Sequence, residues 1–161
     1  MIEKVIILDF GSQYTQLIAR RIRELNIYCE IYNYNVSKEK LIKKNIQAII
    51  LSGGPNSVYD KNAPKLSRYI FDFDIPILGI CYGLQLLIKN MGGKISKGSL
   101  GEYGNVNINI FKEKFNEKQK NIFLNIPNEL NVWMSHTDKV TKVGKDWVYT
   151  ITKRGLGRYK K

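Results

Sequence analysis

A cysteine between two glycines is the feature of this sequence best suited to chemistry. Cys81 stands in Gly79-Ile80-Cys81-Tyr82-Gly83, where a short apolar run ends and an apolar helical pattern begins. A residue on such a strand-to-helix turn is held in a tight bend, and small residues two positions to either side relieve the crowding. The helix that follows directs its N-terminus at the sulfur and favours the thiolate. We therefore predict that Cys81 attacks a carbonyl carbon and forms an acyl thioester.

Backbone donors for the resulting oxyanion are available beside this cysteine. The N–H of Tyr82 follows the nucleophile directly, and Gly53-Gly54 follow an earlier apolar run, where the lack of side chains lets the backbone approach a bound oxygen. Gln85 comes four residues after Cys81, on the same face of the predicted helix, where its amide can hydrogen-bond a polar substrate.

Two alternatives stand beside this interpretation. A free cysteine is often a buried structural residue, which is what we expect of Cys29, in a predicted strand without glycines. The segment Ser52–Ser57 (SGGPNS) also resembles the Ser-Gly-Gly-x-Asp-Ser phosphate loop of ATP pyrophosphatases. A phosphate cradle needs a helix directly behind it, whereas here Asn56 replaces the acid and a turn-like segment follows.

Strands and helices alternate over the first ninety or so residues and would position these groups. The strands are nearly continuous apolar runs, which is typical of a parallel sheet covered on both faces. Chemistry collects at the carboxyl ends of such strands. We predict strands at 5–9, 27–34, 48–52 and 75–80, and helices at 12–25, 37–45, 63–73 and 82–91.

The first of these helices is predicted with the most detail. Ser12 is the expected N-cap, and Leu17, Ile18, Ile22 and Leu25 are spaced to form one apolar face.

The later part of the chain has a different pattern. GNVNINIF (104–111) alternates polar and apolar residues, as a half-exposed antiparallel strand does, and VWMSHTDKV (132–140) and DWVYTI (146–151) read as extended segments. The predicted fold is α/β: an open, mostly parallel, flavodoxin-like sheet with helices on both faces and a few antiparallel strands in the C-terminal part. We expect one domain over 1–161, with 149–161 an atypical basic tail.

Composition narrows the functional classes. The 161 residues are 43% hydrophobic and 25% charged, which is typical of a soluble globular domain. We expect no signal peptide and no membrane span, and the two cysteines are too few for a disulfide framework, so the expected location is cytoplasmic. The formal net charge is +12, but the lysines are spread along the chain, so no nucleic-acid partner is expected. One histidine and two separated cysteines predict no metal site.

Several segments together resemble a known family. ILDFGSQYTQLIARRIREL, LSGGPNSVYD, PILGICYGLQLL, GEYG and VWMSHTDKV are similar, in order and spacing, to the class I (triad-type) glutamine amidotransferase domains of GMP synthases. The likeness covers about residues 1 to 145. It implies hydrolysis of L-glutamine and delivery of ammonia to an ATP-pyrophosphatase (synthetase) domain or subunit that converts XMP to GMP. No cofactor is implied in the present domain, and ATP and Mg are expected in the synthetase.

The resemblance also implies residue roles. Cys81 matches the nucleophile, and Gly54 and Tyr82 match the oxyanion donors, with Gly53 beside them. Gln85 and the segment Ser135-His136-Thr137-Asp138 match positions that hold glutamine, and the charge of Asp138 suits the substrate's α-ammonium group.

One part of the family pattern is missing. The general base and its orienting acid come from a late FHPE element in the family, and the only histidine here, His136, matches the earlier substrate-side position. The sequence therefore predicts a truncated or divergent amidotransferase domain, with His136 as a less favoured substitute base. The competing hypotheses are a catalytically impaired docking module and a nucleotide-binding protein that uses Ser52–Ser57.

Overall fold

The computed structural model describes residues 2–97, 102–109, 125–142, 149–152 and 155–158. The chain divides into two compact units, Met1–Leu87 and Ile88–Lys161, and each is described by itself. In the part of the chain so described, no helix has the length and apolar character needed to span a membrane.

The first unit is built on a parallel sheet of four strands in the order β2-β1-β3-β4. The strands are β1 (Lys4–Asp9), β2 (Cys29–Asn33), β3 (Ile46–Leu51) and β4 (Ile77–Gly79). This order is the start of the flavodoxin-like arrangement, in which ligands bind beyond the carboxyl ends of the strands where the winding reverses. Here that reversal lies between β1 and β3, so the predicted fold class is confirmed for this unit.

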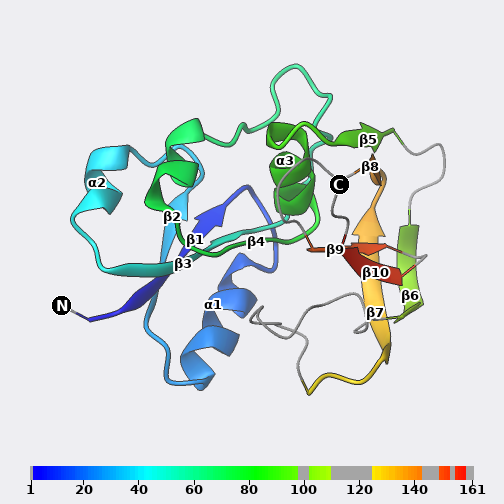
Figure 1. Ribbon diagram of the computed structural model, residues 1–161, viewed down its shortest axis with the longest axis horizontal. Coiled ribbons are helices and arrows are strands. Elements are labelled where there is room, and N and C mark those ends of the chain that lie inside the picture. Colours follow the sequence, from blue (N-terminus) through cyan, green and yellow to red (C-terminus); the bar gives the residue numbers. More distant parts are fainter. Residues whose placement is uncertain (1, 98–101, 110–124, 143–148, 153–154, 159–161) are drawn as a thin grey trace. The chain divides into compact units, whose positions relative to one another are not determined.

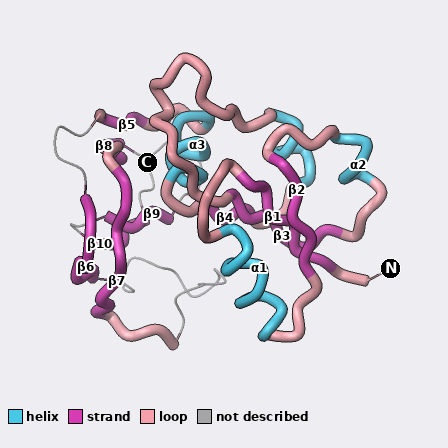
Figure 2. The backbone as a smooth tube through the Cα atoms, turned by 180° about the vertical axis from the view of Figure 1, so that it is seen from behind, coloured by secondary structure: helices cyan, strands magenta, loops and turns pink. Residues whose placement is uncertain are grey.

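Both faces of the sheet are covered, as the apolar strands predict. Figures 1 and 2 show helix α1 (Thr15–Glu24) on one side of the sheet and helix α2 (Lys38–Ile42) on the other. On the α1 side, Ile7, Ala19 and the buried Cys29 form a core cluster. The opposite face of the sheet is also shielded from solvent. Four side chains on that face are fully buried: Ile6, Leu8, Ile49 and Leu51.

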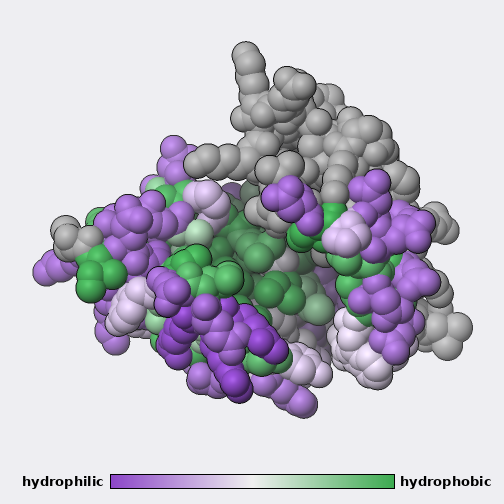
Figure 3. Space-filling model, turned by 90° about the horizontal axis from the view of Figure 1, so that it is seen from below, coloured by the Kyte–Doolittle hydropathy of each residue, from purple (hydrophilic) through white to green (hydrophobic). Residues whose placement is uncertain are grey.

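The buried face of α1 differs from the predicted one. Thr15 and Ala19 are buried, whereas Leu17 and Leu25 are 44% and 71% exposed. Packing against β1 and β2 selects positions 15, 18, 19 and 22, which follow the helical i, i+3, i+4, i+7 spacing. In the space-filling view of Figure 3, hydrophilic residues and groups of apolar residues both reach the face that is seen from below.

The predicted N-cap of α1 is also wrong. The helix begins after Tyr14, because residues 12–14 form a turn in which the Ser12 hydroxyl oxygen accepts a hydrogen bond from the Tyr14 backbone N–H at 3.1 Å. The carboxylate of Asp9 accepts hydrogen bonds from the Gly11 N–H at 2.9 Å and the Thr15 hydroxyl at 2.8 Å. The Asp9 side chain at the end of β1 thus ties down the turn before the helix and the side chain of its first residue.

The helix predicted over 63–73 is shorter than expected. Only η1 (Arg68–Phe73) is helical, with 3-10 geometry, and residues 63–67 are irregular. The Tyr82 hydroxyl donates a hydrogen bond to the Pro64 carbonyl, and Ser67 has an extended backbone. The helical turns therefore begin only after Ser67.

Helix α3 (Tyr82–Asn90) begins in the first unit and ends in the second, and Gly92 and Gly93 follow it. The second unit is antiparallel: β6 (Glu102–Asn109) pairs with β7 (Glu129–His136), β5 (Lys94–Ser96) with β8 (Lys139–Lys142), and β9 (Tyr149–Thr152) with β10 (Gly155–Arg158). Residues 103–109 alternate between exposed and more buried positions, as predicted. The extended segments predicted at 132–140 and 146–151 are confirmed where they are described; residues 146–148 lie outside the described part.

Candidate active site

Cys81 lies on the turn between β4 and α3 with a left-handed backbone, at a φ of 48°. The turn is tied to the end of β3, because the Ile80 N–H bonds the Leu51 carbonyl at 3.0 Å and the Gly83 N–H bonds the Ser52 carbonyl at 3.1 Å. A non-glycine residue with this φ is uncommon, and such strained positions cluster at functional sites.

The two flanking glycines are required by space. A Cβ on Gly79 would lie 2.6 Å from the backbone N and Cα of Leu84, and one on Gly83 would lie 2.7 Å from the Ser52 carbonyl oxygen. Both distances are below the contact limit, and the atoms met are backbone atoms that cannot yield. The predicted reason for the Gly-x-Cys-x-Gly pattern is therefore confirmed in its geometry.

The Gly53-Gly54 turn follows β3 and lies beside this cysteine. A Cβ on Gly53 would lie 3.6 Å from the Cys81 Cβ, and one on Gly54 would lie 2.6 Å from the Phe10 carbonyl oxygen. The backbone N–H groups of both glycines donate to no acceptor within the described residues. The Gly53-Gly54 turn, with its two uncommitted backbone N–H groups, thus lies next to the turn that carries Cys81.

A buried polar network supports this turn, and sequence reasoning missed it. The Ser52 hydroxyl accepts a hydrogen bond from the Phe10 N–H at 2.9 Å and donates one to the Gly53 carbonyl at 2.8 Å. Asp9 ends β1 alongside it. The available signal was a polar residue at the end of β1, Asp9, and one directly after β3, Ser52, because the carboxyl ends of neighbouring parallel strands lie side by side.

Burial raises the pKa of the Cys81 thiol above its usual value. This direction is opposite to the thiolate stabilisation expected from the N-terminus of α3. Removal of water from around the sulfur disfavours the charged thiolate. A thiol with a raised pKa depends more on a neighbouring base to become the attacking thiolate.

The other predicted site residues fall in different parts of the chain. Gln85 is buried in the first turns of α3, where its backbone N–H bonds the Cys81 carbonyl at 3.1 Å. Tyr82 is buried, with its ring 5.9 Å from that of Phe10. In the second unit, Ser135 and His136 end β7, and Asp138 is buried just before β8.

Two alternatives can now be weighed. No helix opens behind Ser52–Ser57, since residues 53–67, all described, carry only turns and irregular backbone. The segment therefore lacks the helix N-terminus of a phosphate cradle. Cys29 is buried, with its thiol directed at the Ala19 carbonyl at 3.5 Å, as expected for a core residue. Among the described residues there is no group of three or more metal-binding side chains.

A doubly covered parallel sheet with a strained cysteine on a glycine-flanked strand-to-helix turn defines a nucleophile-elbow α/β protein. The family model described as "Glutamine amidotransferase class-I" matches residues 6–157. The chain belongs to this family.

Relatives of this chain include GMP synthases. The chain is 47% identical over 150 residues to "GMP synthase [glutamine-hydrolyzing]" of Bacillus subtilis (strain 168), which covers 93% of this chain and 28% of that protein. It is 48% identical over 141 residues to the enzyme of that name from Clostridium tetani, covering 88% of this chain and 26% of the relative. The chain thus spans little more than a quarter of the length of these relatives.

Solved structures agree on the fold. A protein from Thermoplasma acidophilum, described as one subunit of a GMP synthase, superposes with a TM-score of 0.75 at 26% identity, covering 100% of this chain and 79% of that one. A glutamine amidotransferase from Thermotoga maritima superposes with a TM-score of 0.63 at 20% identity, covering 98% and 69%.

Proposed function

We propose that this chain is the glutamine-hydrolysing part of a GMP synthase. The observation that carries the proposal is the strained Cys81 beside the Gly53-Gly54 turn, in a chain 47% identical over 93% of its length to a GMP synthase. We also propose that the whole chain forms one cytoplasmic amidotransferase domain, with 149–161 its atypical end.

In the proposed reaction, the Cys81 sulfur attacks the side-chain amide carbon of L-glutamine. The backbone N–H groups of Gly54 and Tyr82 stabilise the oxyanion of the tetrahedral intermediate. The carbon–nitrogen bond then breaks, ammonia leaves with a proton, and a glutamyl thioester remains on the sulfur. Water hydrolyses the thioester to glutamate and regenerates the thiol.

Substrate-holding roles follow the family motif. Gln85 is proposed to bind the substrate near the sulfur from α3, with Gly53 beside the oxyanion donors. Ser135, His136 and Asp138 are proposed to hold the amino-acid end of glutamine. The ammonia would pass to an ATP-pyrophosphatase domain or subunit that uses ATP and Mg to convert XMP to GMP.

The triad base and its acid are not assigned to residues of this chain. The one histidine of the sequence is His136, at the substrate-side position of the motif. This observation favours a second candidate function, an amidotransferase-like module that docks to a synthetase without hydrolysing glutamine.

Two measurements separate these functions. The intact chain is incubated with a glutamine-mimicking chloroketone, and the adduct is mapped by mass spectrometry; label on Cys81 in the folded protein supports the proposed nucleophile. Ammonia release from glutamine is then measured for the chain and for Cys81→Ala. Release abolished by the substitution supports the glutaminase and excludes the docking module, whereas a folded chain without label on Cys81 overturns the first proposal.

A further inference from the structure

A hollow of about 410 Å³ in the first unit is lined mainly by lysines. Four of the seven lining residues are lysines, and among the described residues that line it Glu39 is the one acid; the lysines are Lys4, Lys40, Lys43 and Lys44. Lys4 is the first residue of β1, and Lys44 precedes β3. Because the strands are parallel, their amino ends lie together, and the hollow lies there. Cys81 lies at the opposite, carboxyl ends of the strands. We call this feature the lysine hollow.

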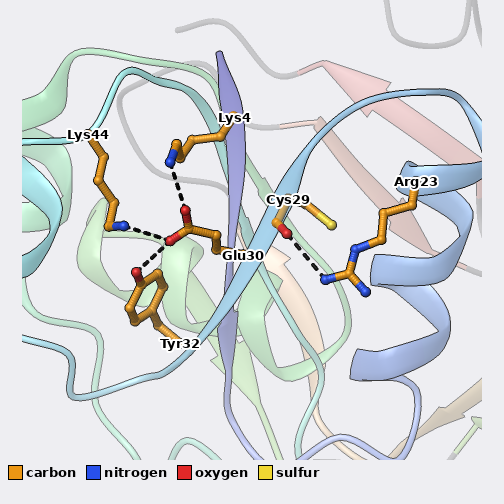
Figure 4. A network of polar contacts seen from close by, with 6 residues as sticks. All are labelled: Lys4, Arg23, Cys29, Glu30, Tyr32 and Lys44. Atoms are coloured by element: carbon orange, nitrogen blue, oxygen red, sulfur yellow. Dashed lines mark hydrogen bonds and ion pairs between the residues drawn. The ribbon is translucent and has the colours of Figure 1, made fainter. Parts of the chain in front are cut away.

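Two of the four lysines are held in place by a single carboxylate. Figure 4 shows Glu30 between the Lys4 ammonium, 2.7 Å from Oε1, and the Lys44 ammonium, 2.7 Å from Oε2, with the Tyr32 hydroxyl donating to Oε2 at 2.5 Å. The Lys4 and Lys44 side chains are only 17% and 24% exposed. Because these lysine side chains are already held in one geometry, they lose less conformational entropy when a ligand binds.

Glu30 and Lys44 keep their charges over the physiological range. The hydrogen bonds from Lys4, Lys44 and Tyr32 lower the pKa of Glu30 to about 2, and Glu30 in turn raises the pKa of Lys44. One carboxylate nevertheless faces two ammonium groups. Each ammonium carries three donors, of which the Glu30 contact uses one.

The remaining two lysines are not paired with acids. Lys40 and Lys43 form no ion pair within the described residues. The Glu39 carboxylate accepts hydrogen bonds from its own backbone N–H and the Ser37 hydroxyl, which lower its pKa. When Glu30 is counted with the residues that line the hollow, four lysines and two acids leave two positive charges in excess.

We propose that the lysine hollow binds a small molecule that carries phosphate groups. Its volume falls within the usual range of small-molecule sites, roughly 300–1,000 Å³. Ammonium groups bind phosphate as point charges, whereas recognition of a planar carboxylate favours the fork of arginine. Among the described residues, no arginine lines the hollow. Two excess positive charges match the charge of one phosphate group at neutral pH, close to minus two.

An extended acidic peptide fits the hollow less well. Peptides commonly bind by adding a strand to a free sheet edge. The strand that supplies Lys4 is β1, which is paired on both sides, with β2 and β3. The proposal does not depend on glutamine hydrolysis, because Cys81 lies at the carboxyl ends of the strands and the lysine hollow at their amino ends.

The experiment is calorimetric titration of the full chain with sodium tripolyphosphate, ADP and hexaglutamate at low salt. The test variant is K40Q/K43Q, which removes the two lysines without ion pairs and leaves the Glu30 cluster intact. The matched control is K61Q/K65Q, which removes the same charge from two exposed lysines of the same unit.

We expect tripolyphosphate or ADP to bind, K40Q/K43Q to weaken that binding about tenfold, and the control to change it less than about twofold. A preference for ADP would indicate a nucleotide as the ligand, and a preference for tripolyphosphate would indicate an inorganic phosphate chain. Absence of binding, equal losses in the two variants, or tighter binding of hexaglutamate than of both phosphates would overturn the proposal.

Nuclear magnetic resonance locates the ligand independently. Titration with tripolyphosphate should shift the backbone amides of Lys40, Lys43 and Asn45 and leave those of Gly53 and Gly83 unchanged. Shifts centred on the Gly53-Gly54 turn would overturn the proposal, whether or not Cys81 proves to be a nucleophile. Chloroketone labelling of Cys81 should be unaffected by saturating tripolyphosphate.

Discussion

The Ser52 hydroxyl accepts a hydrogen bond from the backbone N–H of Phe10 at 2.9 Å and so joins the carboxyl ends of β1 and β3. The same hydroxyl donates to the Gly53 carbonyl at 2.8 Å. Ser52 is fully buried, so no water replaces either contact. One side chain thus fixes both the start of the Gly53-Gly54 turn and its distance from β1.

Ser52→Ala should destabilise the chain and slow labelling of Cys81. The substitution leaves a buried N–H of Phe10 without its acceptor, at a cost of about 1–3 kcal/mol. The substitution also removes the hydrogen bond to the Gly53 carbonyl, so the backbone N–H groups of the Gly53-Gly54 turn are no longer held in one direction. Urea unfolding measures the first effect, and the rate of chloroketone labelling in the folded state measures the second.

Ser67→Ala is the matched control, because the Ser67 side chain makes no capping hydrogen bond to η1. It should change the free energy of unfolding by less than about 0.5 kcal/mol. Equal losses from the two substitutions would mean that the Ser52 contacts have no special role.

Gly83→Ala should be more destabilising than Gly92→Ala. A Cβ at Gly83 would lie 2.7 Å from both the Leu51 Cβ and the Ser52 carbonyl oxygen, whereas one at Gly92 meets nothing within 4 Å. Gly92 has a φ of 75°, so alanine there carries only the left-handed backbone cost of roughly 1–2 kcal/mol. We expect Gly83→Ala to cost about 3 kcal/mol or more, since backbone atoms must move. Urea midpoints of the two variants test this order, and similar midpoints would contradict it.

The sequence predicted the sheet well because its strands are nearly continuous apolar runs. Residues of β1 are buried on both faces of the sheet, so the prediction did not have to decide which face of the strand is buried. The Gly-x-Cys-x-Gly pattern was equally informative, because crowding around Gly79 and Gly83 is local to one turn.

Features that depend on distant segments could not be predicted in this way. Leu17 and Leu25 fit a helical face as well as Ala19 does, and only the position of α1 on the sheet decides between them. Glu30 likewise looks like an ordinary charged residue of a strand. Its partners Lys4 and Lys44 are 26 and 14 residues away, and the parallel pairing of β1, β2 and β3 brings them together.

Glu30 should make stability depend on pH in the acidic range. Its pKa is about 2 in the folded chain against an ordinary value of 4.5, so between these values the unfolded chain takes up a proton that the folded chain does not. The stabilisation is therefore complete above pH 4.5 and is lost as pH falls toward 2. Its size is at most about 2 kcal/mol, because the group is partly exposed and solvent screens it.

The measurement is the free energy of unfolding of the parent chain, Glu30→Gln and Glu3→Gln between pH 7 and pH 2. The gap between parent and Glu30→Gln should narrow as pH falls. Glu3 is exposed and forms no ion pair within the described residues, so Glu3→Gln should follow the parent. A constant gap for Glu30→Gln would show that the carboxylate contributes no pH-dependent stability.

Alkylation of Cys81 should require a higher pH in the folded chain than in the unfolded chain. Burial raises the pKa of this thiol, so a smaller fraction is thiolate at any given pH. Iodoacetamide rates at Cys81, resolved from Cys29 by mass spectrometry of the peptides, give the midpoint in buffer and in guanidinium chloride. If the pH midpoint of alkylation is lower in the folded chain than in the unfolded chain, the N-terminus of α3 and the nearby amides stabilise the thiolate more than desolvation destabilises it.

His136→Ala distinguishes a substrate-holding role from that of a substitute base. If His136 holds glutamine, the chloroketone concentration that gives half-maximal labelling should rise about threefold to tenfold, because one hydrogen bond to a charged group is lost. The maximal rate and its pH midpoint should not change. If His136 is the base, the maximal labelling rate near neutral pH should instead fall by about a hundredfold or more. The pH midpoint of labelling should then move to the pKa of the Cys81 thiol. Asn131→Ala is the control, since Asn131 lies on the same strand and is exposed; a loss equal to that of His136→Ala would mean that damage to β7 causes both effects.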